Sequence, residues 1–149
     1  MQGFLHSDFG KMGLGIIRYL ENPIVGVIDT ENAGSNINIE YEIDRDIPIF
    51  SSLEEVLKKG AEVLVLGIAP SGGKIPKDWL PIIKDAINKR ISIINGLHDT
   101  LGDRFNKKIK NRENQWIWDV RVPKISCEIA TAKASKLTNK RVLMLSLIH

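Results

Sequence analysis

Cysteine is nearly absent from this sequence: Cys127 is the only one among 149 residues. A single thiol forms neither an intramolecular disulfide nor a zinc cluster of cysteines. Structural disulfides belong to oxidising compartments, so this composition favours a cytoplasmic location. We interpret Cys127 as an inert thiol, because no nucleophile signature surrounds it.

Long apolar runs are also missing. No run approaches the roughly 20 residues needed to cross a bilayer. The first ten residues, MQGFLHSDFG, lack the basic and apolar regions of a signal peptide. The sequence therefore predicts neither a membrane partner nor a cleaved leader.

An excess of one charge is lacking too, since 21 basic and 18 acidic residues leave a net charge of +3. The densest basic stretch is Arg104–Arg112, which we interpret as the solvated face of a helix. We predict no nucleic-acid partner. Hydrophobic residues (43%) and charged residues (26%) occur at ordinary globular levels, so we expect one folded domain.

Short apolar runs alternate with helical patterns along the chain. The runs lie at 24–29, 62–67, 91–95 and 116–120; the helical patterns lie at 12–20, 52–59 and 76–90, with a fourth helix capped by Asp99 or Asp103. Apolar strands that alternate with helices form right-handed βαβ units. We predict an α/β, Rossmann-like fold: a mostly parallel, doubly wound sheet with helices on both faces.

Three segments break this alternation. The polar stretch 32–46 suggests a short hairpin around Ile37–Tyr41. Only Gly3–Leu5 precedes the first glycine-rich turn, so we expect a clipped first strand. Arg141–Ile148 has the pattern of a strand with no following helix, and we expect it to be frayed or docked on an edge.

The carboxyl ends of parallel strands form the ligand crevice of such a sheet. A glycine-rich turn comes first, and we assign cofactor binding to its residues Gly10, Lys11, Gly13 and Gly15. Backbone N–H groups at a helix start can approach a phosphate. The spacing matches neither GxGxxG nor GxxxxGK[ST], so a tight turn with close helix–sheet packing is the alternative.

Asp29 ends the apolar run 24–29, which we take as the second strand of the sheet. At this position a dinucleotide-binding fold has an acidic residue that binds the ribose hydroxyls. Capping of the next turn is the alternative for Asp29.

The loop after residue 66 is too glycine-rich for a plain connection, and Lys74 at its end suits an anionic substrate. In this loop we assign cofactor binding to Gly67, Pro70, Ser71, Gly72 and Gly73.

His98 lies at a strand end beside an acid, which suits a catalytic base because histidine titrates near neutrality. A structural histidine is the alternative. Asp119 and Arg121 are assigned to substrate binding, with a surface ion pair as the alternative. His6 and His149 have no metal-ligand spacing, so we predict no metal site.

Six motifs occur in order from about Gly3 to Arg141: GKMGLGIIRYL, VIDTENAG, IPIFSSLEEVL, VLVLGIAPSGGKIP, IINGLHDTL and WDVRVP. As an ordered set they resemble the N-terminal domain of a bacterial and archaeal family long regarded as of unknown function. Some members are named NAD-dependent epimerase/dehydratase-like proteins and others D-glutamate N-acetyltransferases. The resemblance implies a Rossmann-like N-terminal domain followed by a P-loop domain.

In relatives, the segment that matches Lys140–Leu143 leads into a glycine-rich turn ending in Gly-Lys. Here the chain reads Met144–His149 and contains no GxxxxGK[ST]. We therefore expect a Rossmann-like domain at 1–139 and, at 140–149, the stub of the first strand of a missing P-loop domain.

The resemblance implies acyl transfer from acetyl-CoA to the amine of an acidic amino acid. Because the P-loop half is missing, we expect this chain to be inactive alone. An NAD(P)-binding epimerase/dehydratase-like domain is one alternative. A non-enzymatic remnant or homo-oligomeric assembly domain is another, because exposed apolar strands recruit partners.

Overall fold

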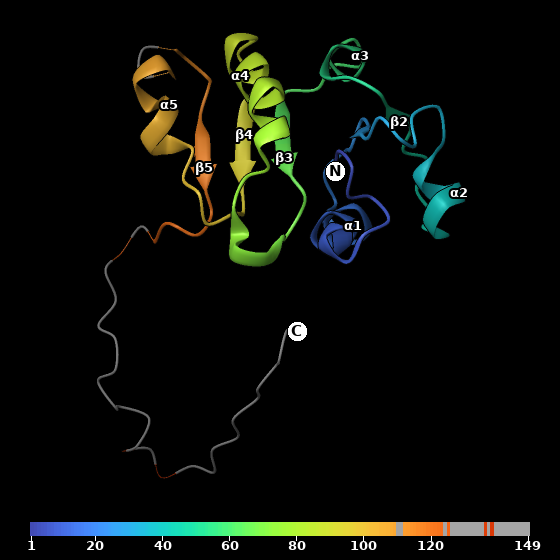
Figure 1. Ribbon diagram of the computed structural model, residues 1–149, viewed down its shortest axis with the longest axis horizontal. Coiled ribbons are helices and arrows are strands. Elements are labelled where there is room, and N and C mark those ends of the chain that lie inside the picture. The colour runs from blue at the N-terminus through green and yellow to red at the C-terminus, as the bar shows by residue number, and fades with distance from the viewer. Residues whose placement is uncertain (110–111, 124, 126–135, 137, 139–149) are drawn as a thin grey trace.

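The computed structural model describes residues 1–109, 112–123, 125, 136 and 138 (Figure 1). Cys127 and the strand expected at Arg141–Ile148 lie outside these residues, as does the stub at 140–149. In the described part of the chain, no helix has the length and apolar character that a membrane crossing requires.

Strands and helices alternate, as the sequence pattern predicts. Their order is α1 (Lys11–Tyr19), β1 (Val27–Ile28), α2 (Ile37–Tyr41), β2 (Ile49–Phe50), α3 (Leu53–Leu57), β3 (Val63–Leu66), α4 (Leu80–Asn88), β4 (Ser92–Asn95), α5 (Gly102–Ile109) and β5 (Ile117–Asp119). Single 3₁₀ turns lie at Asp8–Gly10, Ser71–Gly73 and Lys77–Trp79.

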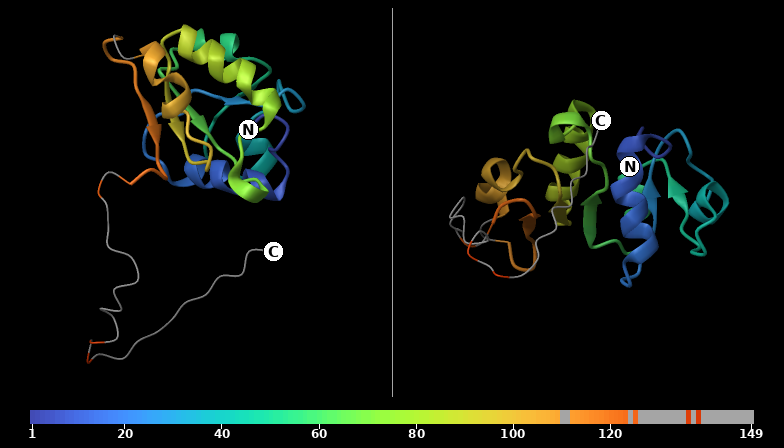
Figure 2. Two further views of the ribbon diagram at one scale, coloured as in Figure 1. Left: turned by 60° about the vertical axis from the view of Figure 1, so that its left-hand side comes forward. Right: turned by 90° about the horizontal axis from the view of Figure 1, so that it is seen from below.

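All ladders between these strands are parallel. β1 pairs with β2, and β3, β4 and β5 form a second sheet in that order. In Figure 1, α4 lies across β3 and β4, while α1 lies between the two sheets, as the right view of Figure 2 also shows. The predicted α/β, Rossmann-like fold is confirmed.

The amino end of the chain lies between the two sheets. The Met1 ammonium donates a hydrogen bond of 3.0 Å to the carbonyl of Ile28 at the end of β1. Gly13, in α1, donates one of 3.1 Å to the carbonyl of Gly67 just after β3. Gly3–Leu5 forms turns and no strand, which agrees with the expectation that this segment is too short for a first strand.

Two apolar clusters hold the elements together. The larger one joins α4 and α5 to β3 and β4 and also includes residues of β1 and α3. Ile83 and Ile87 are fully buried in it, as the predicted helix face requires. The smaller one joins α1 and α2 to β1 and β2 around Leu5 and Ile37. Burial of each such side chain stabilises the fold by about 1.5–3 kcal/mol.

The hairpin expected around Ile37–Tyr41 is wrong, because this segment is helix α2. The Asn36 side-chain oxygen accepts hydrogen bonds from the backbone of Asn38 (3.2 Å) and Ile47 (3.1 Å). An asparagine at this position satisfies the free N–H groups of a helix start, which outweighs the β propensity of the isoleucines. Strand β2, only two residues long, was not among the predicted strands.

The Ser52 cap of α3 is confirmed, since its hydroxyl accepts a hydrogen bond from the Glu55 amide at 3.4 Å. The Glu55 carboxylate returns to the Ser51 amide at 2.9 Å, one residue earlier than in a standard capping box. The basic stretch also behaves as predicted along α5, where Lys107 and Lys108 are exposed.

The cap predicted for α5 is wrong, because neither Asp99 nor Asp103 supplies it. Asp119, at the end of β5, accepts hydrogen bonds from the amides of Leu101 (3.0 Å) and Gly102 (2.8 Å). Parallel pairing of β4 with β5 brings Asp119 to the start of this helix, which no local pattern reveals. A carboxylate at a helix N-terminus is further stabilised by the helix dipole.

We predict that Asp119→Ala lowers the free energy of unfolding by at least about 3 kcal/mol, because it removes two amide hydrogen bonds to a charged group, which contribute about 1.5–3 kcal/mol each. Urea denaturation measures the loss. The matched control is Asp103→Ala, in the exposed first turn of the same helix, for which we expect a loss below about 1 kcal/mol. Equal losses for the two variants would contradict the assignment of the cap.

Stability should also depend on the amino terminus. Burial lowers the pKa of the Met1 α-amino group from 8.0 to about 6, although the charge of Asp29 opposes this shift. The unfolded chain therefore binds more protons between these two pKa values, so the free energy of unfolding rises with pH across that interval.

The expected rise is about 2–3 kcal/mol, since each pKa unit corresponds to about 1.4 kcal/mol. Urea denaturation at pH 5.5 and 8.5 measures it. N-terminal acetylation removes the titrating amine and should flatten the dependence. An unchanged slope after acetylation would assign the dependence to other groups.

Candidate functional site

The carboxyl ends of the strands form one continuous rim. Asp29 follows β1, Gly67 follows β3, Asn95 ends β4 and Asp119 ends β5. The Gly13–Gly67 hydrogen bond joins α1 to the end of β3 at this rim. A side chain built at Gly96 would lie 3.4 Å from Met12, so the first turn of α1 also reaches the end of β4.

The glycine-rich turn is held by close backbone packing. A Cβ at Gly10 would lie 2.5 Å from the Phe4 carbonyl, and one at Gly13 would lie 2.6 Å from the Gly67 carbonyl. Both contacts require glycine, so the tight-turn interpretation accounts for these two positions. Gly15 has open space around it, and a ligand rather than packing would have to explain that glycine.

Lys11, also in this turn, forms an ion pair of 2.8 Å with Asp8, which lowers the pKa of the Asp8 carboxyl. Both side chains are strongly exposed. Exposed ion pairs contribute little, so an anionic ligand can displace Asp8 from Lys11.

Asp29 is fully buried. Its Oδ1 accepts hydrogen bonds from the Glu31 amide (3.2 Å) and from Asn32 Nδ2 (3.1 Å), which agrees with the turn-capping alternative. Its Oδ2 has no hydrogen-bond partner among the described residues. A buried carboxylate oxygen rarely stays unpaired, so this atom is a candidate contact for a ligand hydroxyl.

A polar network beside Asp29 was missed by sequence reasoning. His6 Nε2 lies 3.0 Å from Asn32 Oδ1, and His6 Nδ1 lies 3.1 Å from the Tyr41 hydroxyl. The His6 and Tyr41 rings stack with centroids 5.5 Å apart. The members are 26 and 35 residues apart in the chain, so no local spacing reveals them.

The loop of residues 67–74 connects the two ends of the rim. Its Ala69 amide donates to the Phe9 carbonyl at 2.9 Å, beside the glycine-rich turn. Farther along, Gly72 (φ 74°) and Gly73 (φ 62°) adopt the left-handed conformation that favours glycine. A Cβ at Gly73 would lie 1.9 Å from the ring of His98, so the loop is shaped against the end of β4.

His98 is exposed at this rim, and its amide donates to the Gly73 carbonyl at 2.7 Å. The neighbouring Asp99 does not orient His98, because its Oδ2 accepts a hydrogen bond of 3.0 Å from the Ile75 amide. Asp99 therefore holds the loop. Ser71, Gly72 and Lys74 are exposed along the same segment.

Asp119 and Arg121 have different surroundings and form no ion pair with each other within the described residues. Besides capping α5, Asp119 accepts a hydrogen bond of 2.7 Å from the Asn95 side chain. Arg121 is exposed, and its Nε donates to the Gly96 carbonyl at 2.7 Å. That bond fixes the plane of the guanidinium, whose other four donors lie on the two terminal nitrogens.

The predicted residues thus divide into two groups. We call the first the Asp29 end, formed by Asp29, the glycine-rich turn and Gly67. The second is the Arg121 end, formed by Gly73, Lys74, His98 and Arg121. The hydrogen bonds of the 67–74 loop link them. Asp119 belongs to neither group, because its carboxylate accepts three hydrogen bonds that join β4, β5 and α5.

Comparison with known proteins supports the motifs. Residues 30–123 match the family model described as a domain of unknown function (DUF1611_N), Rossmann-like domain. A D-glutamate N-acetyltransferase from Pseudoalteromonas is 42% identical over 94 residues, covering 62% of this chain and 27% of that protein. Another, from Tritonibacter scottomollicae, is 29% identical over 121 residues, covering 80% and 34%.

A solved structure agrees with these matches. The crystal structure of a DUF1611 family protein from Anabaena variabilis superposes with a TM-score of 0.80 at 38% identity, covering 91% of this chain and 40% of that one. The chain spans about a quarter to a third of the length of the curated relatives that it matches. The resemblance inferred from the ordered motifs is confirmed: this chain belongs to the DUF1611_N family of Rossmann-like domains.

Proposed function

We propose that this chain is the ligand-binding N-terminal domain of an N-acyltransferase that acetylates an acidic amino acid, with acetyl-CoA as the acyl donor. The observation that carries the proposal is the Arg121 end of the rim. There, the Arg121 guanidinium is bonded to the carbonyl of Gly96, which is two residues before the exposed His98. The curated relatives named D-glutamate N-acetyltransferase support this substrate class.

The Arg121 end has the groups that acyl transfer to an amino acid needs. Arg121 binds one substrate carboxylate through its terminal nitrogens, and Lys74 binds the second. His98 takes a proton from the substrate ammonium, which leaves a nucleophilic amine. The amine nitrogen then attacks the thioester carbonyl carbon, and the new N–C bond forms as the C–S bond breaks. The second proton lost by the nitrogen goes to the departing sulfur, so coenzyme A leaves as the thiol.

The Asp29 end holds the acyl carrier in this proposal. A carrier phosphate lies beside the start of α1, where Lys11 supplies a positive charge and the helix dipole favours an anion. Asp29 Oδ2 accepts a hydrogen bond from a ribose hydroxyl. The exposed backbone of the 67–74 loop, with Pro70, Ser71 and Gly72, lines the path between carrier and substrate.

Turnover belongs to the longer protein in this proposal, because the chain covers only 27–34% of the curated relatives. Residues 1–139 supply the rim, and residues 140–149 lead toward a P-loop domain that completes the site. The cytoplasmic location inferred from the lone cysteine is part of the same proposal.

One observation favours a second candidate, an NAD(P)-binding domain. Asp29 is fully buried at the end of β1 with Oδ2 unpartnered, at the position where dinucleotide-binding folds hold a ribose. The glycine spacing argues against this candidate, because the turn lacks GxGxxG.

We predict that Arg121→Gln weakens D-glutamate binding about 10–100-fold, because a hydrogen bond to a charged group contributes about 1.5–3 kcal/mol. Calorimetry measures the affinity, and chemical-shift mapping places the ligand near Gly96 and His98. Arg104→Gln, on the exposed face of α5, is the matched control and should leave binding unchanged. Equal weakening in both variants would show nonspecific charge attraction, and no binding to the parent chain would remove the substrate assignment.

A second titration distinguishes acetyl-CoA binding from dinucleotide binding. We expect saturable binding of acetyl-CoA, weakened about tenfold by Asp29→Asn because the amide replaces a charged acceptor. Asp85→Asn, at an exposed ion pair of α4, is the control. Saturable NADH binding measured by fluorescence, together with no detectable binding of acetyl-CoA, would favour the dinucleotide candidate instead.

A further inference from the structure

His6 lies between two residues whose hydrogen-bonding roles are set by other partners. One is Asn32, whose side-chain nitrogen donates to Asp29 Oδ1 at 3.1 Å. The other is Tyr41, whose hydroxyl donates to the Leu5 carbonyl. The His6 ring contacts both side chains, so their roles decide which of its two nitrogens carries a proton.

Asn32 presents an acceptor to His6. Its Nδ2 is used in the bond to Asp29, so Oδ1 is the atom that lies 3.0 Å from His6 Nε2. Rotating the amide by half a turn would place Oδ1 against the Asp29 carboxylate, where two acceptors repel each other. Because an amide oxygen has no proton to donate, the proton of this bond belongs to His6 Nε2.

Tyr41 also presents an acceptor. A phenol has a single proton, and that of Tyr41 is directed to the Leu5 carbonyl. The Tyr41 oxygen lies 3.1 Å from His6 Nδ1 and accepts there, so Nδ1 carries a proton as well. Burial, together with the charges of Glu40 and Asp29, raises the pKa of the Tyr41 hydroxyl, which keeps the phenol protonated.

A ring with a proton on each nitrogen is an imidazolium cation, and the surroundings of His6 suit a positive charge. Glu40 Oε2 lies 3.5 Å from His6 Nε2, while Glu40 Oε1 accepts a hydrogen bond of 2.5 Å from the Ser35 hydroxyl. The Tyr41 ring lies against the imidazole with centroids 5.5 Å apart, and the face of an aromatic ring attracts cations.

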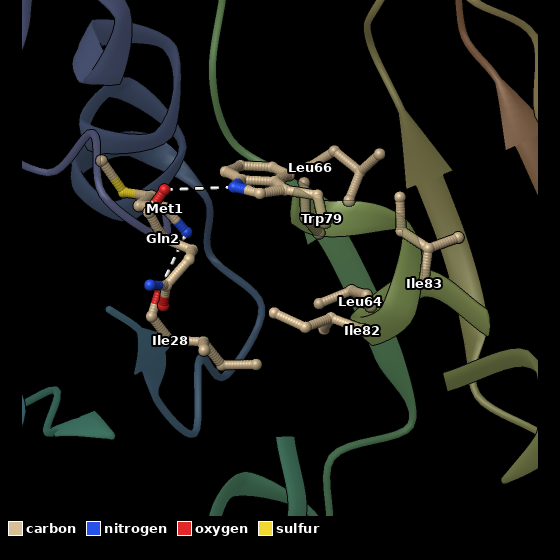
Figure 3. Close-up of a pocket in the computed structure, with 9 residues that line it drawn as sticks. Met1, Gln2, Ile28, Leu64, Leu66, Trp79, Ile82 and Ile83 are labelled. Atoms are coloured by element: carbon tan, nitrogen blue, oxygen red, sulfur yellow. Dashed lines mark hydrogen bonds between the residues drawn. The ribbon is translucent and has the colours of Figure 1, made fainter. Parts of the chain in front are cut away.

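The end of β1 carries a second positive charge near Asp29, the Met1 ammonium. This group donates to the Ile28 carbonyl at 3.0 Å (Figure 3). Burial lowers the pKa of this amine to about 6, and the charge of Asp29 opposes that shift. The amine is the same in every variant of His6, so a comparison among such variants isolates the effect of the ring.

We propose that His6 is a positioning residue for ligands of the Asp29 end, and that its imidazolium form fixes the Asp29 carboxylate through Asn32. The proton on Nε2 holds Asn32 Oδ1, and the amide then presents Nδ2 to Asp29 Oδ1. Asp29 Oδ2 is left for a ligand donor. This step rests on the proposed function, in which that oxygen accepts a hydroxyl of the acyl carrier.

Loss of the Nε2 proton reverses this arrangement. Two acceptors then face each other at 3.0 Å, so the Asn32 amide turns its nitrogen toward His6 and Asp29 Oδ1 loses a donor. A site whose supporting contacts are lost binds its ligand less well. Binding at the Asp29 end therefore weakens as His6 is deprotonated, in the interval near neutrality where histidine titrates.

The test compares three variants of the full chain by calorimetry with acetyl-CoA at pH 6 and pH 8. His6→Leu removes the donor, and Asn32→Leu removes the next link. His6→Gln is the conservative variant, because its amide nitrogen donates at either pH without a titrating proton.

At pH 6 we expect each leucine variant to weaken binding about tenfold, the free-energy equivalent of one hydrogen bond. The double variant should bind no more weakly than either single one, because both act on one chain of bonds. His6→Gln should recover the binding that His6→Leu loses. Raising the pH to 8 should weaken the parent several-fold more than His6→Gln. Parallel pH profiles for the parent and His6→Gln, or additive losses in the double variant, would overturn the proposal.

A measurement without ligand separates this proposal from the function on which it rests. At pH 6, nitrogen-edited NMR should detect a proton on each ring nitrogen of His6, and the Asn32 side-chain amide should exchange about tenfold faster in His6→Leu. If acetyl-CoA does not bind the parent chain, the carrier assignment fails and these spectra alone decide the role of His6. A ring with a single proton, or unchanged Asn32 exchange, would overturn it. If His6→Leu does not fold, the ring protons and the comparison with His6→Gln decide.

Discussion

The hydrogen bond between the Gly13 amide and the Gly67 carbonyl fixes α1 against the end of β3, in a domain whose two halves also share one apolar core. It forms only because both residues lack a side chain, since a Cβ at Gly13 would lie 2.6 Å from that carbonyl. Through this contact α1 is fixed against the end of β3, and the turn before α1 is fixed beside the end of β1. The alignment of the strand ends into one rim therefore depends on these two glycines together with the apolar cluster that Ile28, Leu53 and Val56 share with β3 and α4.

The two ends of the rim satisfy their buried polar groups differently. Asp119 accepts three hydrogen bonds from the protein, which join β4, β5 and the start of α5 into a rigid support. Asp29 is more deeply buried than Asp119, yet one of its carboxylate oxygens has no partner among the described residues. A satisfied carboxylate stabilises the fold, whereas an unsatisfied one costs free energy until a donor arrives. The two aspartates, each at the end of a strand, therefore differ in role: Asp119 supports the fold, and Asp29 is a candidate contact for a ligand.

Local patterns were sufficient to predict the elements whose stability is local. The apolar spacing of Ile83 and Ile87 and the serine cap at Ser52 predict α4 and α3, and the continuous runs predict β3, β4 and β5. Contacts distant in sequence decide the rest: the α5 cap comes from Asp119, and the His6–Asn32–Tyr41 network assembles across three segments. The helix at Ile37–Tyr41 was missed because Asn36 and its bond to Ile47 outweigh the β-branched pattern. The rim itself was predictable, because parallel strands place their carboxyl ends on one edge whatever their order.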